Sequence, residues 1–175
     1  MSIFRNSLSV GTSLLDSVCT KFGTEIILQH SDSEQRITAT VLPAPSRSDS
    51  SKASLRAYMR QLAGFKELPT AIAEAGLLMG IRGFGDIAQG PAFAEDVFRI
   101  EVSGPTGLHL TVVDLPGLIS AANEEQTEDD VRMVQKLVDT YITNPRTIIL
   151  AVVQANNNIA NQGIIQKSRR VYKAG

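Results

Sequence analysis

Cysteine, histidine and net charge are all scarce in this sequence, and each scarcity excludes a class of protein. The one cysteine, Cys19, cannot form an internal disulfide, and with only two histidines a closed four-ligand zinc site would also need carboxylates. The lack of an internal disulfide fits a reducing, intracellular environment. Seventeen Lys and Arg against eighteen Asp and Glu leave a formal net charge of -1. No overall charge therefore attracts nucleic acid or an anionic membrane, and any bound anion must be held by a local site.

Long apolar runs are absent as well. No run approaches the roughly 18 residues that a membrane-spanning helix needs, and residues 1–10, MSIFRNSLSV, lack the apolar core of a secretory signal. The sequence therefore predicts a cytoplasmic protein, with peripheral association with membranes left open. Its composition is 43% hydrophobic and 20% charged, which suits one globular domain over residues 1–175 with its own core.

Strand and helix patterns alternate along the chain and predict an α/β fold with a mixed sheet. Two β-like runs at 24–30 and 36–42, separated by five polar residues, predict a hairpin. A second hairpin is predicted from runs at 96–103 and 108–114, which are joined by a short glycine turn. The apolar run at 146–155 predicts a strand covered on both faces.

Helices are predicted between and after these strands. A first helix is expected over 52–65 and a second over about 69–79. A third begins at Thr127 and stops before Pro145, and the tail from 157 to 175 predicts one more. The apolar residues of the first helix, spaced at helical intervals, are Leu55, Tyr58, Met59 and Leu62, and those of the third are Val131, Val134, Val138 and Tyr141.

Two polar or glycine-rich segments are interpreted as structural. The segment GFGDIAQG at 83–90 follows a helix and precedes a strand, which is the reverse of the order in a dinucleotide-binding fingerprint, so we expect a plain loop. Residues 46–52, SRSDSSK, favour a solvated loop and a helix cap over a phosphate site. Neither His30 nor His109 lies in a ligand spacing, which argues against a metal hydrolase.

The segment from Asp114 to Gly117 is the candidate for chemistry. As a bare D-x-x-G pattern it means little, because nine Asp and thirteen Gly in 175 residues give about 0.7 chance matches. Its position is more informative, since open α/β sheets bind ligands where strands end. A carboxylate there can hold magnesium through water, and the glycine lets a backbone N–H approach a phosphate. Taken alone, the segment fits a strand-terminating turn better.

Three longer segments resemble the dynamin superfamily of large GTPases, especially its fungal dynamin-like and Mx-like branch. They are SVCTKFGTEIIL at 17–28, HLTVVDLPGL at 109–118 and YITNPRTIILAVVQANNNIANQ at 141–162, within a resemblance that runs from Asp16 to Gly175. The resemblance implies a partial dynamin-type G domain with a mixed sheet flanked by helices. It also implies GTP binding and hydrolysis coupled to membrane remodelling, with Mg²⁺ as cofactor. Dynamin-like relatives are the implied partners, and membranes or microtubules are partners by analogy.

The resemblance also implies roles for individual residues. Thr20 would be the catalytic switch threonine, which ligates magnesium and senses the γ-phosphate. Asp114 would hold the same magnesium through water. Leu115, Pro116 and Gly117 would complete the nucleotide-binding segment, with the Gly117 N–H meeting the γ-phosphate.

Two parts of a complete GTP site are not found. The phosphate loop has the pattern G-x-x-x-x-G-K-[ST], and this sequence contains no Gly-Lys dipeptide. The Thr-Lys-x-Asp motif that reads guanine in this family is expected beyond Gly175. We therefore expect a truncated G domain that binds nucleotide very weakly and shows no turnover.

The expected truncation has a structural consequence and leaves other functions open. Without the phosphate-loop strand, the strand over 108–114 would carry an unpaired edge, at about 1–3 kcal/mol for each buried unpaired group. Residues 2–10 could form a replacement strand. The alternatives are a non-catalytic interaction protein that pairs with a full-length relative, and a non-functional gene remnant.

Overall fold

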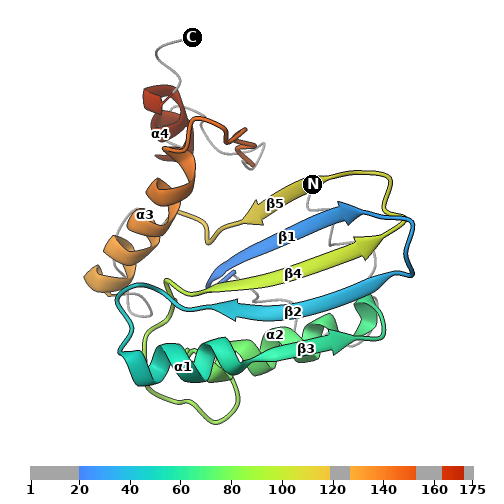
Figure 1. The fold of residues 1–175 in the computed structure, drawn as a ribbon. Coiled ribbons are helices and arrows are strands. Elements are labelled where there is room, and N and C mark those ends of the chain that lie inside the picture. The colour runs from blue at the N-terminus through green and yellow to red at the C-terminus, as the bar shows by residue number, and fades with distance from the viewer. Residues whose placement is uncertain (1–19, 119–126, 153–162, 172–175) are drawn as a thin grey trace.

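The computed structural model describes residues 20–118, 127–152 and 163–171, which form one five-stranded mixed sheet flanked by helices (Figure 1). The order of strands across the sheet is β3-β2-β4-β1-β5. The elements are β1 (Gly23–His30), β2 (Arg36–Leu42), α1 (Asp49–Ala57), β3 (Met59–Leu62), a short 3-10 turn (Phe65–Glu67), α2 (Leu68–Leu78), β4 (Val97–Gly104), β5 (Leu110–Asp114), α3 (Glu128–Ile142) and α4 (Gly163–Val171). The α/β class and the mixed sheet predicted from sequence are confirmed.

The central strand is β4, and its position makes the first predicted hairpin wrong. β4 pairs with β1 in parallel and with β2 antiparallel, so it lies between the two strands that were expected to pair with each other. The alternation of Phe98, Ile100 and Val102, each at most 2% exposed, explains why this strand takes the interior of the sheet. The strand spans themselves lie within a residue of the prediction.

The second predicted hairpin is also wrong, because β1 lies between the two strands that were expected to pair. β5 pairs antiparallel with β1, from Thr24 opposite Asp114 to Leu28 opposite Leu110, and not with β4. The loop that leaves β4 crosses the end of β1, where the Gly107 N–H donates to His30 Nδ1 at 3.2 Å. A short glycine turn therefore connects two strands with a third between them.

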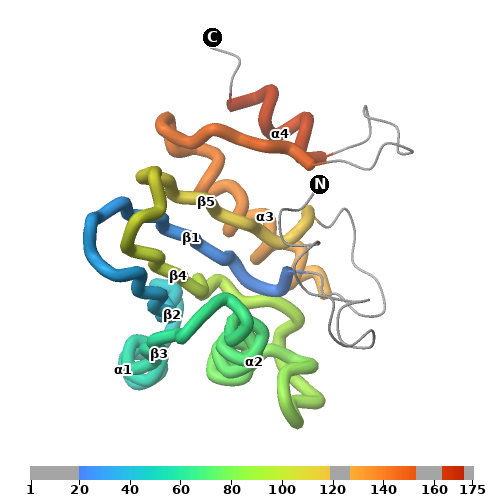
Figure 2. Tube along the Cα trace, turned by 90° about the vertical axis from the view of Figure 1, so that its right-hand side faces the viewer, coloured from blue at the N-terminus to red at the C-terminus, as the bar shows by residue number. Residues whose placement is uncertain are grey.

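Helices α1 and α2 pack on one face of the sheet. They lie toward the edge formed by β3 and β2, at the opposite end of the strand order from β5 (Figure 2). The first helix ends at Ala57, so the predicted helix over 52–65 is wrong beyond that point. Tyr58 adopts an extended conformation, and Met59–Leu62 pairs with β2 as an edge strand, which overrides the helical spacing of its apolar residues. The core of this face is formed by Phe22, Ile37, Ala39, Val41, Leu55, Leu62, Leu68, Ala71, Ala75, Met79, Ile81, Ala94, Phe98, Ile100 and Val102.

Helix α3 packs on a second, smaller cluster. It begins with a capping box, in which the Thr127 hydroxyl accepts from the Asp130 N–H and the Asp130 carboxylate accepts from the Thr127 N–H. Of the predicted stripe, Val134 and Val138 are buried, and Val131 and Tyr141 are half-buried. The cluster consists of Ala92, Phe93, Val134, Val138 and Ile142, with Leu115, Leu118, Met133, Ile149 and Ile164 packed against it. Helix α3 therefore rests on the chain that leaves β5.

The predicted strand at 146–155 is absent from its described part, residues 146–152, which form no helix or strand. The side chains of Ile148, Leu150 and Val152 are 94, 87 and 68% exposed, whereas Ile149 packs on the second cluster. A strand needs a backbone partner as well as an apolar sequence, and no described strand pairs with this segment.

The remaining predictions on local structure have mixed outcomes. Residues 83–90 form a loop of turns, as predicted, and α4 confirms part of the predicted tail helix. Ser48 caps α1 by accepting from the Ser51 N–H, as expected for residues 46–52. The proposed replacement strand at 2–10 lies outside the described residues.

Among the described residues, no helix combines the length and apolar character of a membrane span.

Candidate functional site

Thr20 and Asp114, which are 94 residues apart in the sequence, meet at one end of the sheet. The Thr20 hydroxyl donates a hydrogen bond to Asp114 Oδ2 at 3.1 Å. The pairing of β1 with β5 explains the contact, because Asp114 lies opposite Thr24 and the chain entering β1 therefore runs past the end of β5. Both predicted magnesium ligands thus lie together at a strand end.

The segment after Asp114 presents a glycine to solvent. Leu115 packs against Gly23 and the second cluster, and Pro116 is buried, so both anchor the chain as it leaves β5. Gly117 is exposed, and a Cβ built on it would meet no atom within 4 Å. The two apolar residues fix the segment, and the glycine leaves its backbone open to a ligand.

The donor set of this site suits a hard cation. A hydroxyl and a carboxylate are oxygen ligands of the kind that Mg²⁺ prefers, and Mg²⁺ completes its coordination with water and phosphate oxygens. Among the described residues, no group of three or more His, Cys, Asp and Glu could hold a metal by itself. A cation bound between Thr20 and Asp114 would therefore need further oxygen atoms from water or a ligand.

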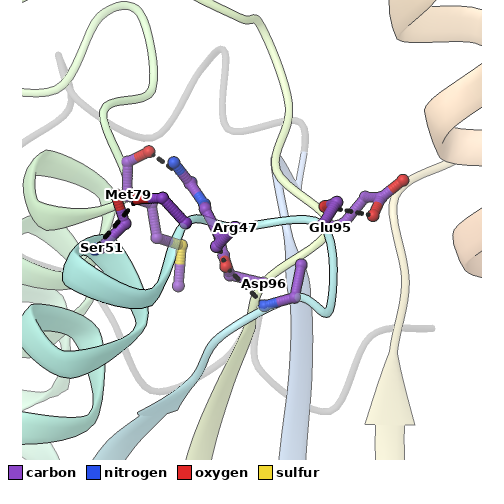
Figure 3. Close-up of polar contacts among 8 residues, drawn as sticks. Arg47, Ser51, Met79, Glu95 and Asp96 are labelled. Carbon is purple, nitrogen blue, oxygen red and sulfur yellow. Dashed lines mark hydrogen bonds and ion pairs between the residues drawn. The ribbon is translucent and has the colours of Figure 1, made fainter.

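A buried ion pair that the sequence did not reveal lies elsewhere, between Arg47 and Asp96 (Figure 3). Asp96 is fully buried and accepts hydrogen bonds from the Ala44 N–H at 2.8 Å and from Arg47 Nε at 3.1 Å and Nη2 at 2.5 Å. Arg47 Nη2 also donates to the carbonyl of Met79 at 2.7 Å. The pair joins the loop before α1, the end of α2 and the start of β4, which is a structural role.

Neighbouring contacts extend this cluster toward α3. The carboxylate of Glu95 accepts from the Ser46 hydroxyl at 3.0 Å (Figure 3). It also accepts from Lys136 Nζ at 2.9 Å. The sequence showed only that two acidic residues, Glu95 and Asp96, directly precede an apolar strand. Charges of this type usually remain in solvent, so the pattern gave no reason to expect burial.

Two tyrosines with raised pKa values also mark structural contacts. Burial and a hydrogen bond to Glu74 raise the pKa of Tyr58 to about 12. The Tyr58 hydroxyl links the residue between α1 and β3 to α2. Burial and the nearby carboxylate of Glu25, in β1, raise the pKa of Tyr141 in α3. Neither side chain belongs to the segments that carry Thr20 and Asp114.

Comparison with known proteins gives one family. The model described as "Dynamin family" matches residues 16–175. Among curated proteins, the mitochondrial dynamin-like GTPase MGM1 of Chaetomium thermophilum is 35% identical over 89 residues, which are 51% of this chain and 9% of MGM1. Phragmoplastin DRP1A of Arabidopsis thaliana is 35% identical over 77 residues, which are 44% of this chain and 13% of the relative.

A third relative, the interferon-induced GTP-binding protein Mx of Siniperca chuatsi, is 33% identical over 86 residues. The match covers 49% of this chain and 14% of that protein. The matched region is thus between 9 and 14% of the length of these three relatives.

Proposed function

This chain belongs to the dynamin family, and on that basis we propose that Thr20 and Asp114 form the magnesium and γ-phosphate side of a GTP site. The observation that carries the proposal is the 3.1 Å hydrogen bond between Thr20 Oγ1 and Asp114 Oδ2. It brings together, at the end of a strand, the two oxygen ligands that the family resemblance assigns to magnesium. Their separation of 94 residues in the sequence gives no reason for them to meet, and the pairing of β1 with β5 accounts for the contact.

The residues of this site have separate proposed roles. Thr20 is the catalytic switch threonine, whose hydroxyl binds the cation and senses the γ-phosphate, and Asp114 holds the cation through water. Leu115 and Pro116 place Gly117, whose N–H binds the γ-phosphate. Bound Mg²⁺ would supply neutralisation of the charge that develops on the transferred phosphoryl group.

We further propose that this chain alone binds GTP weakly and does not turn it over. Binding of the α and β phosphates normally depends on the backbone N–H groups and lysine of a phosphate loop. The sequence has no Gly-Lys dipeptide. The chain therefore lacks the lysine that would bind the phosphates of the nucleotide, and we expect its affinity for GTP to be low. Coupling to membrane remodelling and association with membranes or microtubules remain proposals from the family.

Asp114→Ala tests the proposed metal ligands. We expect Mn²⁺, a paramagnetic substitute for Mg²⁺, to broaden the NMR resonances of Thr20 and Gly117 in the full chain. The substitution should weaken this binding by at least about a hundredfold, because it removes the only carboxylate of the proposed site. Asp129→Ala is the matched control, since Asp129 is an exposed carboxylate on α3.

Two results would contradict parts of this proposal separately. Mn²⁺ broadening that is absent from Thr20, or that persists in Asp114→Ala, would rule out the assigned ligands. A fluorescent GTP analogue in magnesium is expected to bind with a dissociation constant of about 1 mM or weaker. Micromolar binding would show that the nucleotide affinity is not defective.

A second candidate function is pairing with a dynamin-like relative, and the exposed apolar edge of the sheet favours it. β5 is the last strand in the order, and its side chains Leu110 and Val112 are 48 and 45% exposed. The exposed apolar segment 146–152 lies beyond β5 in both views of the chain (Figures 1 and 2). Within the part of the chain that the structure describes, β5 pairs only with β1. A strand edge that is open beside apolar side chains is a template for an added strand from another protein.

Lysines at Leu110 and Val112 test this pairing. We expect the wild-type chain to co-elute with a full-length dynamin-like relative in size-exclusion chromatography and the Leu110→Lys/Val112→Lys variant to elute alone. Charges at the edge disfavour strand addition. Leu78→Lys, at a leucine that is 41% exposed near the end of α2, is the control. Equal co-elution of all three proteins would contradict the assigned edge, and a wild-type chain without folded structure in circular dichroism would support the gene-remnant alternative.

A further inference from the structure

The loop between α2 and β4 contains a phenylalanine, Phe84, held between two glycines. Gly83 and Gly85 have φ angles of +86° and +54°, a region that other residues rarely adopt. The loop is closed by backbone hydrogen bonds from the Gly83 N–H to the carbonyl of Ile87 at 2.9 Å and from the Arg82 N–H to the carbonyl of Pro91 at 3.0 Å. Phe84 is therefore presented at a fixed position.

The ring of Phe84 occupies a notch in α2 that a single glycine provides. A Cβ on Gly76 would lie 2.5 to 2.6 Å from three carbons of the Phe84 ring. On its other side, the Phe84 ring lies 6.1 Å from the ring of Phe22, which in turn makes an edge contact with Phe98 in the core. The loop is thereby packed between α2 and the chain that enters β1.

Lys21 adds polar contacts between the same two segments. Its Nζ donates to the carbonyl of Arg82 at 2.8 Å and lies 5.6 Å from the centre of the Phe84 ring. Its own carbonyl accepts from the Ala94 N–H at 3.0 Å. Both residues that follow Thr20 are thus held by the chain between α2 and β4.

We infer that this loop positions Thr20, with Phe84 and Lys21 as positioning residues for the site at Asp114. Thr20 precedes Lys21 directly, so its Cα is fixed within 3.8 Å of a residue with three tertiary contacts. The hydroxyl of Thr20 reaches Asp114 only if the backbone before β1 keeps this path. The inference rests on the proposed function for the role of Thr20, but the geometry that it concerns is independent of bound metal.

Phe84→Ala and Gly76→Ala test the inference by two different changes to one contact. The first removes the ring and the second displaces it. We expect each to shift the NMR resonance of the Thr20 methyl group toward its position in Asp114→Ala, where the hydroxyl has no carboxylate partner. We also expect each to weaken Mn²⁺ binding by about tenfold, as for other residues that orient a metal ligand.

The controls separate positioning from loss of stability. Phe84→Leu keeps an apolar side chain in the notch and should retain most of the wild-type Mn²⁺ affinity. Phe65→Ala removes the same atoms from an exposed ring near the other end of α2 and should leave the Thr20 resonance unchanged. Lys21→Met keeps the apolar stem but removes the donor to Arg82, and provides a second test if the other variants do not fold.

The outcomes distinguish this inference from the proposed function. A folded Phe84→Ala variant with the wild-type Thr20 resonance, or a Phe65→Ala variant with an equal shift, would overturn the positioning role. A wild-type chain that does not bind Mn²⁺ would contradict the proposed metal site. In that case the methyl resonance of Thr20 would still decide whether the loop sets its position.

Discussion

Arg47→Met is expected to lower the free energy of unfolding by about 3–5 kcal/mol, as measured by urea denaturation. The substitution leaves the Asp96 carboxylate fully buried, with the Ala44 N–H as its remaining partner in the cluster. A buried charge without its counter-ion is among the most costly defects in a folded protein. Since small domains are stable by roughly 5–15 kcal/mol, the variant would lose a large share of its stability.

The companion variants show whether the ion pair itself is responsible. Asp96→Ala should cost less, because the Arg47 side chain is 30% exposed and can turn toward water. The double variant should be more stable than the sum of the single losses implies, with a coupling of about 0.5–3 kcal/mol. Arg56→Met, at an exposed arginine on α1, should change stability by no more than about 0.5 kcal/mol. Additive losses would show that the two charges do not stabilise each other.

Burial of this pair could not be predicted from the sequence. Arg47 lies among serines in a segment that was interpreted as a solvated loop and helix cap. Its neighbour Ser48 is indeed the cap of α1. Asp96 lies 49 residues further along the chain. The burial of a charge depends on a partner that only the tertiary fold supplies, so local composition carries no sign of it.

Four of the five strands were predictable, whereas β3 was predicted as helix, and the pairing of the strands was not predicted. A period-two pattern shows which side chains share a face, and it placed β1, β2 and β4 within a residue or two. It does not show which strand lies alongside. Short connections favour hairpins, yet β4 lies between β1 and β2 because its buried residues need an interior position. Segment 146–152 makes the same point, since an apolar pattern without a partner backbone forms no strand.

The candidate site was predicted by resemblance and not by spacing. Nothing in the separation of Thr20 from Asp114 indicates contact, and the D-x-x-G segment alone fits a turn better. The pairing of β1 with β5 brings the two residues together, although the sequence predicted a different partner for each of these strands. The contact therefore depends on strand order, which the local pattern did not contain. The packing of Phe84 against Gly76 and Phe22 was missed because residues 83–90 were interpreted only as a loop.

Phe98→Ala is expected to lower the free energy of unfolding by about 3–5 kcal/mol. Phe98 has no exposed surface and lies near the start of β4, the middle strand, so the lost ring would leave a cavity between the sheet and its helices. Urea denaturation measures the loss. Phe98→Leu should show a smaller loss, because it keeps part of the volume, and Phe65→Ala, at a ring that is 53% exposed, should show little.

The same substitution should also disturb the site, because Phe22 packs edge-on against Phe98 with ring centres 6.2 Å apart. Phe22 connects Thr20 to the core, so loss of its partner should speed hydrogen exchange at the amides of Phe22 and Gly23 by more than at α3. Exchange that rises equally in α3 would show only a global loss of stability. Exchange that rises selectively before β1 would show that one aromatic chain, from Phe98 through Phe22 to Phe84, supports both the core and the position of Thr20.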